Sequence, residues 1–223
     1  MRIDIITLFP DQLAAFTQTS ILGRALERNT LEVVMHNLRD WGIGNHKQVD
    51  DTPYGGGNGM LFKVDVVVSA IRDVQKLSPL ESTVILMTPR GKRFTQGIAE
   101  QLSKKKRLIL VAGHYEGFDE RIRNYVDIQI SLGDFVLTGG ELPALALVDA
   151  VARLIPGVLT EGSAHEESHT LKNSSGERLL EYPQYTRPEV FENQAVPPTL
   201  LSGNHQQIAE WRKSHAVRAQ NQT

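Results

Sequence analysis

Short apolar runs alternate with segments of helical spacing along the chain as far as Pro156. The runs predict five strands, at Arg2–Phe9, Leu31–Leu38, Ser82–Thr88, Arg107–Gly113 and Asp127–Gly133. Apolar positions three or four residues apart predict helices between them, over 11–28, Val64–Leu77, Thr95–Lys104, Glu120–Tyr125 and Leu142–Leu154. Strands that are nearly continuous in apolar residues and alternate with helices are typical of an α/β domain with a mainly parallel sheet.

The pattern changes after Pro156-Gly157. Residues Thr160–Gly176 are rich in Ser, Gly, Glu and His and have few apolar positions, which is typical of a linker. Beyond it the chain is punctuated by proline, and only Gln206–Gln220 has helical spacing. We therefore expect a main α/β domain at 1–158, a flexible linker at 159–176 and a small, mainly helical domain at 177–223.

Composition narrows the functional classes. The chain has 223 residues, 40% of them hydrophobic, and no cysteine, so we expect neither a disulfide framework nor a thiolate metal site. The amino-terminal apolar run is short for a signal peptide and is interrupted by Asp4, which favours a cytoplasmic protein. The longest apolar-rich stretch, 136–158, carries charges, which argues against a membrane span. A net charge of −2 restricts any nucleic-acid surface to a local patch.

The sequence HEESH at His165–His169 has the H-E-x-x-H spacing of zinc peptidases. Such a site needs the motif inside a long amphipathic helix and a third ligand beyond it. Here the motif lies between Gly162-Ser163 and the sequence NSSG, which is a poor context for a helix. A solvated acidic linker is the simpler interpretation, and a zinc peptidase is kept as an alternative.

Three segments at the ends of predicted strands are candidates for a ligand pocket. They are TPRG at Thr88–Gly91, GHYEG at Gly113–Gly117 and SLGDFVLTGGELP at Ser131–Pro143. Ligands of open α/β sheets bind outside the carboxyl ends of the strands. Together the segments would supply free backbone groups, Tyr115 and Phe135 as aromatic walls, and Glu116 as a negative group for a cation. Each segment alone is also consistent with ordinary turn chemistry.

A glycine-rich loop, YGGGNGM at Tyr54–Met60, is a further candidate. It matches neither the phosphate-binding pattern G-x-x-x-x-G-K-[ST] nor the dinucleotide pattern G-x-G-x-x-G, so a flexible turn is the simplest interpretation. Its four glycines nevertheless lack Cβ atoms, which would allow a planar ligand to approach the backbone closely.

Five segments, taken in order, resemble the TrmD family, the bacterial tRNA (guanine-N1)-methyltransferases. They read DDTPYGGGNGM, GHYEGFDER, SLGDFVLTGGELPALALVDAVARLIPGV, YTRPEVF and VPPTLLSGNH. The similarity runs from about Arg2 to about Arg212, which is nearly the whole chain.

The resemblance implies the SPOUT fold, in which a parallel sheet carries a deep trefoil knot around S-adenosylmethionine. It also implies a homodimer with active sites at the subunit interface. Members of the family methylate N1 of the guanosine at tRNA position 37, just 3′ of the anticodon, and use Mg²⁺, for which we assign no ligands. A knot runs against the general rule that connections do not thread loops, so this expectation rests on the resemblance.

The resemblance also implies roles for individual residues. Those of the methyl-donor pocket are Met87, Thr88, Pro89, Gly113, Tyr115, Glu116, Ser131, Leu132, Gly133, Asp134, Phe135, Val136, Leu137, Gly139, Gly140 and Pro143. Those that would meet the target guanine are Tyr54, Gly55, Gly56, Gly57, Asn58 and Gly59, with Asn58 where the family usually has proline. Arg153 matches the family's functional arginine, although a cation at the end of a helix also suits the helix dipole.

The family's catalytic linker has the pattern E-x-S-x-x-x-D-S, and this chain reads EGSAHEES from Glu161 to Ser168. Glu167 therefore takes the place of the catalytic aspartate. N1 of guanine needs a base to remove its proton, and Arg153 would stabilise the charge that then builds on O6. On this reading the histidines of HEESH are incidental.

Two departures from the family pattern motivate an alternative. Glu167 adds a methylene to the expected carboxylate, and the chain ends soon after Trp211-Arg212, where the family usually continues with further helix. The alternative is a catalytically weakened tRNA-binding module of the same fold.

Overall fold

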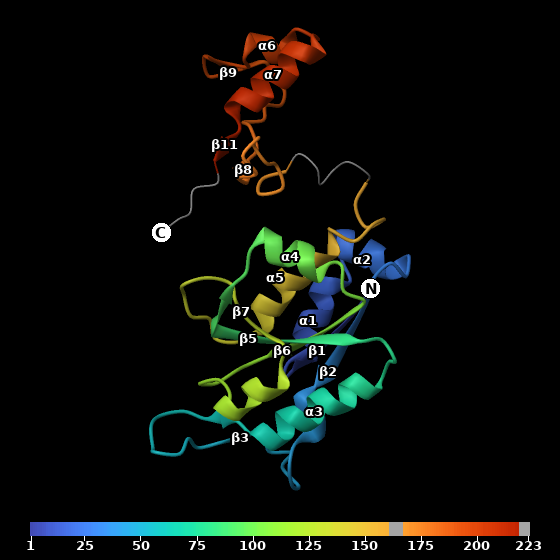
Figure 1. Cartoon of the computed structure of the whole chain (residues 1–223), viewed down its shortest axis with the longest axis vertical. Coiled ribbons are helices and arrows are strands. Elements are labelled where there is room, and N and C mark those ends of the chain that lie inside the picture. The colour runs from blue at the N-terminus through green and yellow to red at the C-terminus, as the bar shows by residue number, and fades with distance from the viewer. Residues whose placement is uncertain (161–166, 219–223) are drawn as a thin grey trace. The chain divides into compact units, whose positions relative to one another are not determined.

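The computed structural model of the chain describes residues 1–160 and 167–218 (Figure 1). The chain divides into two compact units, Met1–Leu159 and Thr160–Thr223. In the described residues, no helix combines the length and the apolar character needed to cross a membrane.

A five-stranded parallel sheet forms the centre of the first unit. Its strands are β1 (Arg2–Thr7), β2 (Glu32–Asn37), β5 (Ser82–Arg93), β6 (Arg107–Ala112) and β7 (Ile128–Ser131). They lie in the order β2-β1-β6-β5-β7, and every pairing is parallel. The expected α/β domain with a parallel sheet is confirmed.

Helices cover both faces of this sheet. One face carries α1 (Pro10–Thr17), α2 (Ser20–Glu27), α4 (Gln96–Leu102) and α5 (Glu141–Ala152). The other carries α3 (Val64–Lys76) and the 3-10 helices η1 (Leu38–Trp41) and η2 (Glu120–Tyr125), beside the short hairpin of β3 (Asp50–Asp51) and β4 (Leu61–Phe62).

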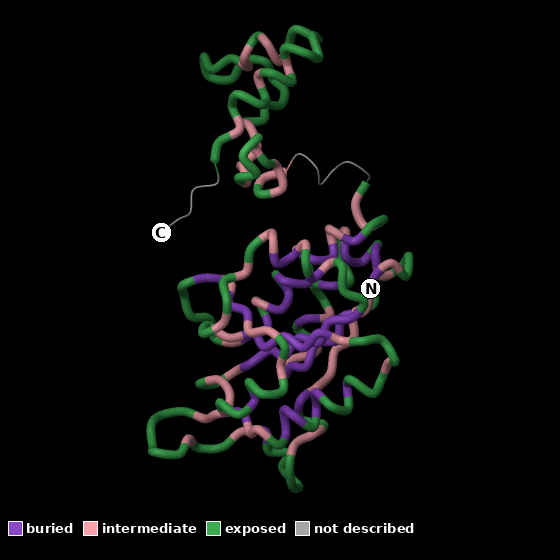
Figure 2. The backbone as a smooth tube through the Cα atoms, viewed as in Figure 1, coloured by how far each residue is buried: buried purple, intermediate pink, exposed green. Residues whose placement is uncertain are grey.

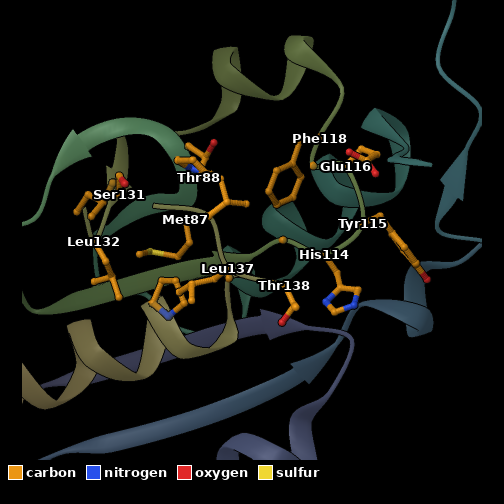
Figure 3. Close-up of a pocket in the computed structure, with 18 of the residues that line it drawn as sticks. Met87, Thr88, His114, Tyr115, Glu116, Phe118, Ser131, Leu132, Leu137 and Thr138 are labelled. Carbon is orange, nitrogen blue, oxygen red and sulfur yellow. The ribbon is translucent and has the colours of Figure 1, made fainter. Parts of the chain in front are cut away.

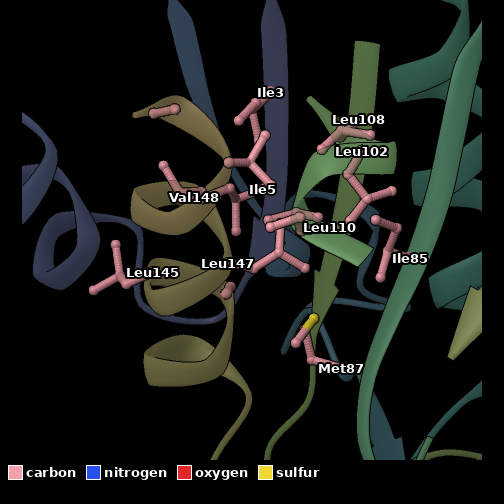
Figure 4. Close-up of a cluster of buried hydrophobic side chains, with 14 of the residues drawn as sticks. Ile3, Ile5, Ile85, Met87, Leu102, Leu108, Leu110, Leu145, Leu147 and Val148 are labelled. Atoms are coloured by element: carbon pink, nitrogen blue, oxygen red, sulfur yellow. The ribbon is translucent and has the colours of Figure 1, made fainter. Parts of the chain in front are cut away.

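Alternation along the strands explains the two layers, because successive side chains of a strand point to opposite faces. Ile3 and Ile5 pack with α5 in one buried cluster (Figure 4), whereas Ile6 packs with α3 in the other. The buried residues therefore lie along both faces of the sheet, as the purple segments of Figure 2 show. This is why the strands are nearly continuous in apolar residues.

Strand β5 is longer than the sequence predicts. It continues past Thr88 to Arg93, with an irregularity in its pairing to β7: both Met87 and Lys92 oppose Ile130. Gly91 allows β5 to pair with β7 a second time, because a Cβ on residue 91 would lie 2.4 Å from the backbone nitrogen of Ile130. The predicted end at Thr88 was wrong, since Pro89 and Gly91 are typical of turns and hide the continuation.

Two predicted helices also differ. The helix expected over 11–28 is broken into α1 and α2 at Gln18-Thr19, because α2 packs closely on that turn: a Cβ on Gly23 would lie 2.4 Å from the Gln18 carbonyl oxygen. The segment Glu120–Tyr125 is a 3-10 helix, begun by the Asp119 side chain, which accepts a hydrogen bond from the Arg121 N–H.

A buried ionic cluster joins β1, β2, β6 and the end of α3. Asp4 and Arg107 are both 0% exposed, and Arg107 Nε donates to Asp4 Oδ2 at 2.8 Å. His36 Nε2 and Arg2 also contact the Asp4 carboxylate. Burial alone would raise the pKa of Asp4, but the hydrogen bonds from His36, Arg2 and Arg107 outweigh it and hold the pKa far below its usual value.

The second unit is small and mixed. It contains α6 (Pro198–Leu201), α7 (His205–His215) and four short strands, β8 (Leu179–Leu180), β9 (Val190–Phe191), β10 (Gln194–Ala195) and β11 (Val217–Arg218). The helix expected over Gln206–Gln220 ends at His215, because 217–218 pair with β8, and 219–220 lie outside the described residues. None of the unit's described residues is fully buried. Its packing centres on Trp211, which stacks on His215 at 4.0 Å.

Candidate active site

A pocket lies at the carboxyl edge of the parallel sheet, where β5, β6 and β7 deliver three segments (Figure 3). Its walls are Met87, Thr88, Pro89, Gly113, His114, Tyr115, Glu116, Gly117, Phe118, Ile130, Ser131, Leu132, Phe135, Val136, Leu137, Thr138, Gly139, Gly140 and Pro143. The three segments are the ones singled out at the strand ends, and the strand order brings them together because β5 lies between β6 and β7.

The residues predicted for a donor pocket line this cavity, with two exceptions. Gly133 is not among the lining residues, and a Cβ on it would meet the Phe135 ring at 2.7 Å. Asp134 is turned to solvent, and its Oδ2 accepts a hydrogen bond from Arg93 Nη2 at 3.0 Å. Both lie in the predicted loop, but Gly133 has no side chain to offer and the Asp134 side chain points to Arg93, which the sequence does not reveal.

Five lining residues have no individual role in the family resemblance. They are His114, Gly117, Phe118, Ile130 and Thr138. His114, Gly117 and Thr138 belong to segments already proposed at the strand ends, whereas Phe118 directly follows the second segment and Ile130 directly precedes the third. His114 carries the most chemistry of the five, since it is the one titratable side chain among them.

Backbone contact between two loops shapes the pocket. The Gly140 N–H donates to the Gly113 carbonyl at 2.6 Å, and a Cβ on Gly140 would lie 2.6 Å from the Gly113 nitrogen. A side chain cannot be accommodated at that distance without moving main chain. The glycine at 140 is therefore required by packing, and the contact fixes the mouth of the pocket between β6 and α5.

Tyr115 has an unusual backbone in this pocket. Its φ of 57° lies in the left-handed region, which non-glycine residues rarely occupy. Its ring packs against Phe62, with 5.4 Å between the ring centroids, which holds the residue in place. Strain of this kind persists where the surroundings impose it and is frequent at functional sites.

The glycine-rich loop is connected to the pocket through main-chain hydrogen bonds. Glu116 N–H donates to the Met60 carbonyl at 3.1 Å, and Phe62 N–H donates to the Gly117 carbonyl at 2.9 Å. Four glycines of the loop, at 55, 56, 57 and 59, have positive φ, which explains why glycine is used there. Tyr54 at its start is fully exposed, and Asn58 lies between these glycines. The structure thus brings this predicted loop next to the pocket loop.

The two predicted catalytic residues belong to different units. Arg153 caps the carboxyl end of α5 in the first unit, where its N–H donates to the Asp149 carbonyl at 3.2 Å. It is not among the residues that line the pocket. Glu167 belongs to the second unit, where its carbonyl accepts hydrogen bonds from the Thr170 and Leu171 N–H groups.

The described part of HEESH does not form a long helix. Ser168 to Thr170 are a turn, and His169 has a φ of 65°. His165 and Glu166 lie outside the described residues. Within 1–160 and 167–218, no group of three or more His, Asp or Glu side chains is arranged to hold a metal ion.

Comparisons with known proteins agree with the resemblance. The family described as tRNA (guanine-1)-methyltransferase TrmD matches residues 1–223. A tRNA (guanine-N(1)-)-methyltransferase of Chloroflexus aggregans is 51% identical over 219 residues, covering 98% of this chain and 84% of that protein. The proteins of the same name from Dehalococcoides mccartyi and Syntrophotalea carbinolica are 49% identical over 220 residues and 51% identical over 218, covering 86% and 85% of those proteins and 98% and 97% of this chain. The chain therefore belongs to the tRNA (guanine-1)-methyltransferase TrmD family.

Proposed function

We propose that the chain transfers a methyl group from S-adenosylmethionine to N1 of the guanosine at tRNA position 37. The observation that carries the proposal is the pocket at the carboxyl edge of the sheet, formed by the segments that the family resemblance assigns to the methyl donor. Relatives about half identical to the chain bear the name of this activity.

The pocket residues suit the proposed donor. Met87, Ile130 and Leu137 offer apolar contact to a purine ring, while the backbone groups of Gly113 and Gly140 and of the 131–139 loop offer hydrogen bonds to its edge. Glu116 supplies a negative charge for the amino group or the sulfonium. When bound, the donor supplies an electrophilic methyl group on positively charged sulfur. We propose Gly133 and Asp134 as supports of this loop, since they do not line the pocket.

We propose roles for the residues on the acceptor side as well. Glu167 would accept the N1 proton of guanine, and Arg153 would stabilise the negative charge that develops on O6. The loop from Tyr54 to Gly59 would meet the guanine through its backbone, and the positive φ values of its glycines support that role. A guanidinium suits this task because its charge is fixed and its donors form a planar fork.

Several finer features of the family are proposed for this chain. We propose the knotted SPOUT topology for 1–158, a catalytic linker at 159–176 and a tRNA-binding domain at 177–223. We also propose a homodimer with its active sites at the subunit interface, which the exposed apolar side chains of Phe135, Val136 and Leu142 near the pocket support. Auxiliary Mg²⁺ and a cytoplasmic location belong to the same proposal.

Transfer of labelled methyl to an unmodified tRNA transcript with guanosines at positions 36 and 37 tests the function. The control transcript has adenosine at 37. Methylation confined to the guanosine transcript is expected. If the chain binds both substrates and forms no product, the proposed enzymatic activity is wrong and the weakened tRNA-binding module is favoured.

A set of glutamate variants tests the proposed base. We expect Glu167→Gln to lower the rate about a hundredfold or more, since general-base catalysis contributes that much. Glu27→Gln, a change of the same kind at an exposed position of α2, should leave the rate unchanged. Full activity of Glu167→Gln together with loss in Glu166→Gln would move the base by one position; Glu166 lies outside the described residues.

A further inference from the structure

Three polar side chains to which the family resemblance assigns no role meet beside the pocket. Thr7 ends β1, His114 follows β6, and Glu141 is the first residue of α5. His114 lines the pocket, where Figure 3 shows its ring near Thr138, whereas Thr7 and Glu141 are not among the lining residues. The cluster therefore joins the wall of the pocket to the ends of a strand and a helix.

Glu141 is held in a fixed position. It is 9% exposed, and its Oε1 accepts a hydrogen bond of 2.9 Å from the hydroxyl of Thr7, which is itself 0% exposed. The Thr7 oxygen in turn accepts a hydrogen bond from the Phe9 N–H. The first turn of a helix also favours a negative charge. Glu141 is thus a buried acceptor with a second oxygen available.

His114 has a ring nitrogen that lacks a hydrogen-bond partner. Its Nδ1 is buried and has no hydrogen-bond partner among the described residues. Glu141 Oε2 lies 3.8 Å from that nitrogen, which is too far for a hydrogen bond. A buried polar atom without a partner is costly and calls for an explanation. A movement of about 1 Å would convert this contact into a charge-assisted hydrogen bond.

Gly139 connects this pair to the pocket. A Cβ on Gly139 would lie 2.2 Å from Glu141 Oε2 and 2.7 Å from His114 Nδ1, so the pocket loop passes directly beside both atoms. The next residue, Gly140, donates to the carbonyl of Gly113, which precedes His114. A change in the separation of His114 and Glu141 must therefore move the pocket wall.

We propose that Glu141 is a positioning residue of the methyl-donor pocket and acts through His114. When the donor fills the pocket, the Nδ1–H of His114 donates to Glu141 Oε2 and fixes the turn at Gly139 and Gly140 against the ligand. Thr7 holds the carboxylate in place for this contact. The proposal rests on the proposed function, because it takes S-adenosylmethionine as the ligand.

The test uses S-adenosylhomocysteine as the probe and the full chain labelled with nitrogen-15 in its histidines. The signal of His114 is assigned with His114→Gln. Saturation of the wild-type chain should convert His114 Nδ1 into a hydrogen-bonded N–H donor. This spectroscopic change reports the contact itself, so a residue that merely supports the fold would not produce it.

Binding measurements on three variants accompany the spectra. Thr7→Val removes the hydroxyl that holds Glu141, and Glu141→Gln keeps the shape but removes the charge; each should weaken binding of S-adenosylhomocysteine about tenfold. Thr17→Val is the matched control, because it removes another buried hydroxyl, one that donates to carbonyls of its own helix. Its affinity should equal that of the wild type.

The outcomes separate the two proposals. A wild-type chain that does not bind S-adenosylhomocysteine would overturn the proposed function and this inference together. Binding with an unchanged His114 signal would overturn the inference alone. So would variants at Thr7 and Glu141 that bind as tightly as Thr17→Val. If Thr7→Val does not fold, Glu141→Gln decides.

Discussion

Replacing Arg107 by methionine removes the centre of the buried ionic cluster while keeping an apolar stem in its place. Arg107 Nε donates to Asp4, Nη1 donates to the carbonyls of Gln75 and Ser78 at 2.9 and 3.1 Å, and Nη2 donates to the carbonyl of Val74. One guanidinium therefore binds the β1 carboxylate and also caps the carboxyl end of α3.

The structure sets the size of the effect. Removing one partner of a buried ion pair costs about 3–5 kcal/mol, because the other charge stays buried. Asp4 retains Arg2 and His36, which reduces the cost, but the carbonyls of Gln75 and Ser78 at the end of α3 lose this donor, which raises it. We expect Arg107→Met to lower the free energy of unfolding of the first unit by about 4 kcal/mol.

Urea unfolding followed by Trp41 fluorescence measures this change. Trp41 lies in the first unit, and Trp211→Phe removes the tryptophan of the second. With an m value of about 2 kcal/mol per M, the midpoint should fall by about 2 M. Protein concentration is held constant, because assembly would shift the midpoint by mass action.

Two comparisons can refute the reasoning. Arg39→Met changes an exposed arginine and should alter the free energy by less than about 0.5 kcal/mol. Arg107→Met and Asp4→Asn should be strongly non-additive, since their side chains are in contact. A loss below about 1 kcal/mol in Arg107→Met, or strict additivity of the two changes, would mean that the pair does not hold the unit together.

Three further predictions concern the acid limit of stability, the pocket and the chemistry. Asp4 has a depressed pKa in the folded chain, so its contribution to the free energy of unfolding is present above its ordinary pKa of about 4 and is lost at lower pH. Asp4→Asn should therefore be less stable than the wild type at pH 7. In acid-unfolding curves it should lose less stability than the wild type between about pH 4 and 2. Gly140→Ala should abolish binding of S-adenosylhomocysteine in calorimetry. Gly44→Ala should retain it, because there a Cβ meets open space and the φ of 70° adds only local backbone strain. Arg153→Lys should lower kcat about a hundredfold with unchanged donor affinity in steady-state assays, because lysine lacks the planar fork.

The parts of the fold that periodicity could predict are those decided locally. The five strands and α3 were found because their apolar positions are buried on both faces or on one stripe. The continuation of β5 to Arg93 was missed because it depends on pairing with Ile130, which is distant in sequence. The pairing of 217–218 with 179–180 was missed for the same reason.

The candidate site shows the same limit. Glycines 113 and 140 were identified from the family pattern, but their contact through main-chain atoms is a product of strand order. The orientation of Asp134 toward Arg93 depends on the bend of β5 and could not be read from a motif. His114 gave no separate signal, since the partner that makes it interesting, Glu141, is far from it along the chain.

The hydrogen bonds between residues 60–62 and 116–119 have a consequence for how the two substrates influence each other. A ligand that favours one arrangement of Glu116 and Gly117 must change the affinity for a ligand that meets the glycine-rich loop, and thermodynamic reciprocity makes the two changes equal. We expect this heterotropic linkage to appear as a donor-dependent dissociation constant for tRNA. Because main-chain atoms form these bonds, replacing the side chains leaves the bonds in place. The coupling between the two ligands is then a property of the backbone.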